Sequence, residues 1–117
     1  MYHSPMGKRP LSAELLPGTL EMLVLKTLSR GEAHGYAIAR RLEQVSGDVL
    51  QVGESSLYPA LQRLLVNGWV KAEWGETSNG RRARFYKITP AGRKRLAEES
   101  AGFERIVGAI AAVMNEG

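Results

Sequence analysis

Cysteine is absent from the 117 residues of this sequence. The absence excludes disulfide bonds, thiolate metal ligands and a cysteine nucleophile, and it suits a reducing cytosol. No apolar run approaches the roughly 18 residues that a membrane helix requires, and the N-terminus lacks the long apolar stretch of a secretory signal. We therefore expect a cytoplasmic protein with no membrane-spanning segment and no structural zinc.

Recognisable catalytic motifs are also missing. The sequence contains no Gly-rich phosphate loop, no nucleophile elbow and no pair of histidines spaced for a metal. The four glutamates near the C-terminus have no histidine beside them, which favours solvated charges over a metal site. The sequence therefore predicts a protein that is not an enzyme and that uses neither a cofactor nor a metal.

Basic residues are concentrated in the middle of the chain. The formal net charge of the whole chain is +4, but residues 54–95 contain nine Lys and Arg against three Glu and so carry +6. Such a segment is typical of a surface that contacts phosphates. A basic face that is merely solvated would give the same count.

The length suits about one domain, and the apolar content of 44% is ordinary for a folded one. Residues 1–13 show no sustained periodicity, so we expect a flexible N-terminal arm. Apolar residues then recur at helical spacing, which predicts a helix from Thr19, as N-cap, to Gly31 and a second from Gly35 to about Gly47.

A third helix is predicted to end at Asn67-Gly68, after a brief strand at 49–52. It begins at Ser55 or Ser56. Pro59 favours Ser56 as the cap, because a proline in the first turn replaces an N–H that would have no partner in the helix. The face opposite its buried leucines is small and polar.

Two β-rich runs at 69–74 and 83–88 flank a loop that contains Asn79-Gly80, a strong turn signal. They predict a hairpin with a basic tip. Thr89 then caps a last helix that runs to about residue 114, with Pro90 at its first position.

The last helix carries an apolar seam at nearly heptad spacing. A terminal helix of this length cannot bury the whole seam against so small a domain, so a second chain is its natural cover. We therefore predict a homodimer whose interface contains Leu96, Phe103, Ile106, Val107, Ile110, Val113 and Met114.

Three helices followed by a basic hairpin are the order of a winged helix-turn-helix. The predicted fold is mainly α with a small β-hairpin, divided into a DNA-binding domain at 14–89 and a dimerisation helix at 90–117. In this arrangement Gln62 can pair with adenine and Arg63 with guanine or phosphate. Ser55 and Ser56 add hydroxyls and amides where the helix dipole favours a phosphate.

Four segments together resemble the PadR family of transcriptional regulators: 15–23 (LLPGTLEML), 34–38 (HGYAI), 55–61 (SSLYPAL) and 82–92 (RARFYKITPAG). The resemblance implies a dimeric repressor of the short class that binds a palindromic operator in double-stranded DNA. It also implies a small aromatic effector, since members commonly sense such molecules between subunits. The residues that match the family's DNA-contacting positions are Tyr36, Ser55, Ser56, Tyr58 and Pro59 in the helix-turn-helix and Arg81, Arg82 and Arg84 in the wing.

Several residues allow more than one interpretation. His34 could contact a phosphate or cap the second helix, and Tyr58 could be half-buried while its hydroxyl reaches a phosphate. Trp69 fits the core, whereas Trp74 could stack on an aromatic effector. The whole chain could also be a winged-helix module that grips an acidic protein instead of DNA; steep weakening by salt and displacement by generic duplex would distinguish DNA binding.

Overall fold

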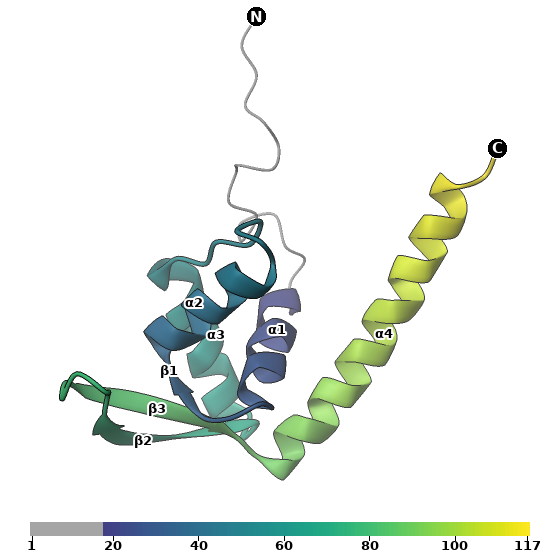
Figure 1. Cartoon of the computed structure of the whole chain (residues 1–117). Helices are drawn as coiled ribbons and strands as arrows, with labels where there is room; N and C mark the ends of the chain where they lie inside the picture. Colours follow the sequence, from purple (N-terminus) through teal and green to yellow (C-terminus); the bar gives the residue numbers. More distant parts are fainter. Residues whose placement is uncertain (1–17) are drawn as a thin grey trace, which may run out of the picture.

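The computed structural model describes residues 18–117, so the predicted arm at 1–13 lies outside the described residues (Figure 1). The described chain forms four helices and one small sheet, which confirms the predicted mainly α fold with a hairpin. The elements are α1 Thr19–Leu28, β1 Ala33–His34, α2 Gly35–Val45, α3 Glu54–Val66, β2 Val70–Glu76, β3 Arg82–Ile88 and α4 Pro90–Met114.

The sheet is antiparallel, with strand order β1-β3-β2. The hairpin pairs Val70 with Ile88 at its base and Glu76 with Arg82 at its end. Its turn is closed by Thr77 N–H donating to the carbonyl of Arg81 at 2.8 Å, and Gly80 supplies the required positive φ of 79°. The hairpin therefore forms where the Asn-Gly signal predicts it.

The core lies between α1, α2, α3 and the inner face of the sheet. Each helix contributes a stripe of aliphatic residues at helical spacing, and alternate residues at the end of β3 point inward. Its buried members are Leu20, Val24, Leu25, Leu28, Ile38, Leu42, Val52, Leu57, Ala60, Leu61, Leu64, Val70, Tyr86 and Ile88.

The predicted side-chain caps of α1 and α3 are wrong. Gly18, in the left-handed conformation with a φ of 87°, is the N-cap of α1, so Thr19 is already inside the helix. The N-cap of α3 is Gly53, whose carbonyl accepts from two amides of the first turn. Pro59 consequently lies beyond the first turn, and the Ser55 carbonyl, four residues before it, receives no helical N–H. Both residues are exposed, so solvent can satisfy that carbonyl.

Two further expectations differ from the structure. The helix α1 ends at Leu28 rather than near Gly31, and the hydroxyl of Ser29 donates to the carbonyl of Lys26 at its end. Residues 49–52, all within the described part of the chain, form no strand. The amide of Leu50 instead donates to the hydroxyl of Ser46 at 2.9 Å, which ties this segment to the end of α2.

The entry into α4 is closely packed. Thr89 is its N-cap as predicted: its Oγ1 accepts from the Gly92 amide at 3.0 Å and donates to the Gly68 carbonyl at 2.7 Å. Beyond this point α4 extends away from the body, so that its C-terminal half stands apart from the other helices (Figure 1). Trp69, expected in the core, is only partly buried: it packs against the core and under the guanidinium of Arg95.

Candidate nucleic-acid interface

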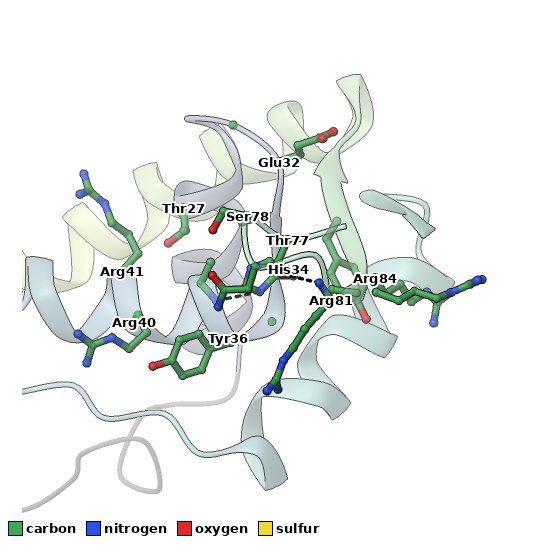
Figure 2. Close-up of a pocket in the computed structure, with 18 of the residues that line it drawn as sticks. Thr27, Glu32, His34, Tyr36, Arg40, Arg41, Thr77, Ser78, Arg81 and Arg84 are labelled. Atoms are coloured by element: carbon green, nitrogen blue, oxygen red, sulfur yellow. Dashed lines mark hydrogen bonds between the residues drawn. The ribbon is translucent and has the colours of Figure 1, made fainter. Parts of the chain in front are cut away.

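A groove separates α2 from the outer half of the hairpin, which is the wing (Figure 2). Its volume is about 1270 Å³, above the roughly 300 to 1,000 Å³ of typical small-molecule pockets. Figure 2 shows Tyr36 and Arg40 on α2 and Arg81 on the wing around one opening. The dimensions suit part of an extended surface better than an enclosed ligand cavity.

The groove is strongly cationic. Its lining residues include one acid, Glu32, and six arginines, Arg30, Arg40, Arg41, Arg81, Arg82 and Arg84. Among these arginines only Arg40 is held by an acid within the described residues, at 3.3 Å from Glu43. Clustered arginines on one concave surface attract a polyanion and can contact its phosphates.

The wing presents its arginines beside aromatic rings. Arg82 and Arg84 lie on one face of β3, because they are two residues apart in a strand. The Cζ of Arg82 is 4.8 Å from the ring centroid of Trp74, and that of Arg84 is 5.9 Å from the ring centroid of Tyr86. These cation–π contacts support the planar groups while leaving both arginines exposed.

The beginning of α2 is fixed by His34. The Nδ1 atom of His34 accepts from the amide of Ala37 at 3.3 Å, and its ring meets the ring of Phe85 edge-on with centroids 5.3 Å apart. The capping interpretation of His34 is thus the one that the structure shows. Two residues after this cap, Tyr36 has 71% of its surface exposed at the edge of the groove.

Tyr58 reaches the groove from α3. It is 46% exposed, and its ring and hydroxyl lie against Gly35, where an added Cβ would be 2.7 Å from Oη. The half-buried position expected from the sequence is therefore present. Gly35 allows the two helices to approach closely enough for Tyr58 to line the same opening as Tyr36.

The remaining predicted residues lie on the outer face of α3 and do not line the groove. Ser55, Pro59 and Gln62 are exposed, and Ser56 is half-buried beside them. Successive residues of a helix are turned by about 100°, so Gln62 points outward while Arg63 points toward the flank. The candidate site thus has two parts, the groove and the outer face of α3.

Arg63 is engaged by α1. Its Nε donates to Oε2 of Glu21 at 2.8 Å. This hydrogen bond raises the pKa of the Arg63 guanidinium above its ordinary value; desolvation opposes the shift, and the negative charge of Glu21 adds to it. The sequence gives no sign of this contact, because the two residues are 42 positions apart.

Sequence reasoning also missed the arginines outside the wing. Arg40 and Arg41 fall on the side of α2 opposite its apolar stripe, and Arg30 follows α1. All three line the groove. Two adjacent arginines one turn after the exposed Tyr36 are the signal that could have indicated a phosphate contact.

The seam of α4 is exposed in the single chain. Leu96 alone packs against the core, while Phe103, Ile106, Val107, Ile110, Val113 and Met114 are between 45% and 76% exposed. Over residues 18–117, no helix combines the length and the apolar character needed to cross a membrane, and no three His, Asp or Glu gather as metal ligands.

The Transcriptional regulator PadR-like family model matches residues 24–98, which run from the second half of α1 through the wing to the start of α4. The chain belongs to this family. It is therefore a PadR-family transcriptional regulator with a winged-helix fold, as the four sequence segments indicate. The match covers both parts of the candidate interface.

Several individual proteins are similar to this chain, and two of them are described as transcriptional regulators. The chain is 30% identical over 93 residues to a transcriptional regulator of Mycobacterium tuberculosis, covering 80% of this chain and 83% of that protein. It is 40% identical over 90 residues to an uncharacterized 37.1 kDa protein in a Streptomyces fradiae transposon, covering 77% of this chain but only 24% of that protein. A PadR family transcriptional regulator from Eggerthella lenta matches with a TM-score of 0.75 and 28% identity, over 92% of this chain and 91% of that structure.

Proposed function

We propose that this PadR-family protein is a dimeric repressor that binds a palindromic operator in double-stranded DNA. The observation that carries the proposal is the groove, in which six arginines and one acid lie beside the polar outer face of α3. The outer face enters the major groove of the duplex, and the arginines contact the backbone on either side.

Base recognition is assigned to α3. Gln62 is exposed at the centre of its outer face and carries the amide that pairs with adenine. Ser55 and Ser56 lie in the first turn, where hydroxyls and the helix dipole favour a phosphate. Pro59 leaves this face narrow, with no long side chain between the serines and Gln62.

Backbone contacts are assigned to the groove and its rims. Tyr36 and Tyr58 each present a hydroxyl beside the arginines, and neutral donors of this kind are common phosphate contacts. Arg81, Arg82 and Arg84 extend from the wing toward the minor groove or the adjacent strand. We add Arg40 and Arg41 of α2 to the residues predicted from the sequence.

The exposed seam of α4 forms the dimer. Its six exposed apolar residues form one stripe on the part of the helix that leaves the body. A second copy of α4 would cover this stripe and relate two winged domains by a two-fold axis. The half-sites should then be about 10 bp apart, or a multiple of that spacing.

Release from DNA by a small aromatic effector completes the proposal, as the family resemblance implies. Binding in the presence of phenolic acids checks this part separately from DNA recognition. The proposal keeps the cytoplasmic location expected from the sequence, because a repressor must be in the compartment that contains its operator.

Selection of bound duplexes from a random pool tests the proposed function. We expect enrichment of a sequence with two-fold symmetry, bound with an affinity that falls steeply with salt. A pool that remains random would contradict the proposal. Binding to an acidic protein that generic duplex cannot displace would instead favour the winged-helix module for protein contact.

A further inference from the structure

One ion pair in the described part of the chain joins two different helices. Arg63 of α3 donates through Nε to Oε2 of Glu21 in α1 at 2.8 Å. The other two ion pairs, Arg40 with Glu43 and Arg95 with Glu99, each lie within a single helix. The contact between Arg63 and Glu21 therefore sets the position of a side chain relative to the body of the domain.

The pair is asymmetric in its exposure. The side chain of Glu21 is 19% exposed and that of Arg63 is 55% exposed. The carboxylate is thus sheltered at the first turn of α1, while the guanidinium extends to the surface beside the outer face of α3. In this geometry Glu21 acts as the fixed partner and Arg63 as the side chain that it holds.

Only Nε of the guanidinium takes part in this hydrogen bond. Within residues 18–117, the two terminal nitrogens of Arg63 make no hydrogen bond. These two nitrogens are the donors that reach O6 and N7 of guanine in a bidentate contact. An arginine already held through Nε loses less conformational freedom when it makes that contact.

We propose that Glu21 is a positioning residue for DNA recognition, holding Arg63 through Nε so that its terminal nitrogens contact a guanine next to the base contacted by Gln62. This inference rests on the proposed function, since it requires α3 to lie in the major groove. It assigns a recognition role to a residue of α1, a helix that carries none of the predicted DNA contacts.

The charge of Glu21 has a second consequence. A carboxylate near the duplex repels phosphates, and this repulsion weakens binding to every sequence equally. The gain from the Arg63 contact applies only where a guanine is present. Glu21 should therefore raise the ratio of operator affinity to non-specific affinity through both effects.

The test compares five full-length proteins, and one control variant described below, on the selected operator, on an operator changed at the guanine, and on unrelated duplex. They are the wild type, Glu21→Ala, Glu21→Gln, Arg63→Ala and the double variant Glu21→Ala with Arg63→Ala. We expect Arg63→Ala to reduce the preference for guanine, measured as the ratio of the affinities for the two operators, by about tenfold. Glu21→Ala should lose most of the same preference while binding unrelated duplex more tightly.

Two variants and one control separate positioning from charge. Glu21→Gln keeps an acceptor oxygen for Nε and should recover much of the preference lost in Glu21→Ala. In the double variant the preference should equal that of Arg63→Ala alone, because the two residues act through one contact. Glu98→Ala removes an equally negative, exposed residue of α4 and should leave the preference for guanine unchanged.

Three results would overturn the inference. The first is a Glu21→Ala protein that retains the full preference for guanine. The second is a loss of preference on Glu21→Ala that is as large in the Arg63→Ala background as in the wild type. In DNA-free protein, nuclear magnetic resonance could also find that the Arg63 Nε–H exchanges as fast as in Glu21→Ala. A wild type that selects no duplex would instead refute the proposed function, and slow exchange of this proton would then show a purely structural contact.

Discussion

The guanidinium of Arg82 stacks on the ring of Trp74, with its Cζ 4.8 Å from the ring centroid. Trp74 is 62% exposed and belongs to β2, whereas Arg82 begins β3, so the contact crosses the hairpin. Exposed contacts of this kind contribute about 0.5 to 1 kcal/mol. That is enough to restrict where the guanidinium lies without burying it.

Arg82→Ala is expected to weaken DNA binding on all sequences and to reduce the slope of log affinity against log salt by about 1, because one phosphate contact is lost. Band-shift titrations at several salt concentrations measure both quantities, and Arg81→Ala should behave in the same way. Arg105→Ala on α4 removes the same charge away from the groove and serves as the control. A change of sequence preference in Arg82→Ala would show base reading by the wing.

Gln62→Ala should change which base is preferred at one position of each half-site. The amide of Gln62 can pair with adenine, and the loss of such a pair costs about 1 to 3 kcal/mol of discrimination. Selection from a random pool with the variant measures the change, with Gln51→Ala, an exposed amide outside α3, as the control. The same selected sequence for Gln62→Ala and the wild type would contradict the assignment.

His34→Ala is expected to lower the free energy of unfolding by about 1 kcal/mol, because the Ala37 amide loses its cap. The ring contact with Phe85 is also lost in this variant. His34→Asn separates the two effects, since asparagine is a good cap without an aromatic ring. Urea unfolding should show recovery in His34→Asn; equal destabilisation of both variants would assign the effect to the ring contact.

The hairpin, α2 and the cap of α4 could be predicted because their signals are local. Asn79-Gly80 lies in the turn itself, and Thr89 is three residues from the amide that it caps. The starts of α1 and α3 could not be predicted in the same way. Their N-caps are glycines that act through backbone conformation, so the sequence places the more obvious Thr19 and Ser56 in that role.

Long-range contacts limit what the sequence says about the site. The strand β1 has only two residues and exists because it pairs with Tyr86 and Phe85, far along the chain. The outer face of α3 follows from helical periodicity, which is why Gln62 and Ser55 are exposed as expected. The contact that holds Arg63 depends on how α1 packs against α3, and periodicity within one helix contains no information about it.

Gly92→Ala should destabilise the domain by roughly 1 to 3 kcal/mol, because the new Cβ would overlap the backbone carbonyl of Trp69 and approach Ile88 at 2.8 Å. The backbone on the other side cannot move as a side-chain end could. Gly108→Ala is the matched control in the same helix, where an added Cβ meets nothing within 4 Å. It should stabilise the helix by about 0.5 to 1 kcal/mol. Thermal unfolding compares the two, and equal melting temperatures would contradict the tight packing at Gly92.

Val107→Glu is expected to produce monomers, because it places a charge in the apolar seam that a second α4 would cover. Val107 is 45% exposed in the single chain, so the substitution buries no new charge within one subunit and folding should be retained. Ala112→Glu adds the same charge about half a turn away from the seam and should leave the dimer intact.

Sedimentation equilibrium measures the mass of each protein. A dimer in both variants would place the subunit interface elsewhere, whereas a monomeric wild type would refute the homodimer itself. Since two linked half-sites bind far more tightly than one, the Val107→Glu monomer should also lose most of its affinity for the full operator while keeping its weak binding to an isolated half-site.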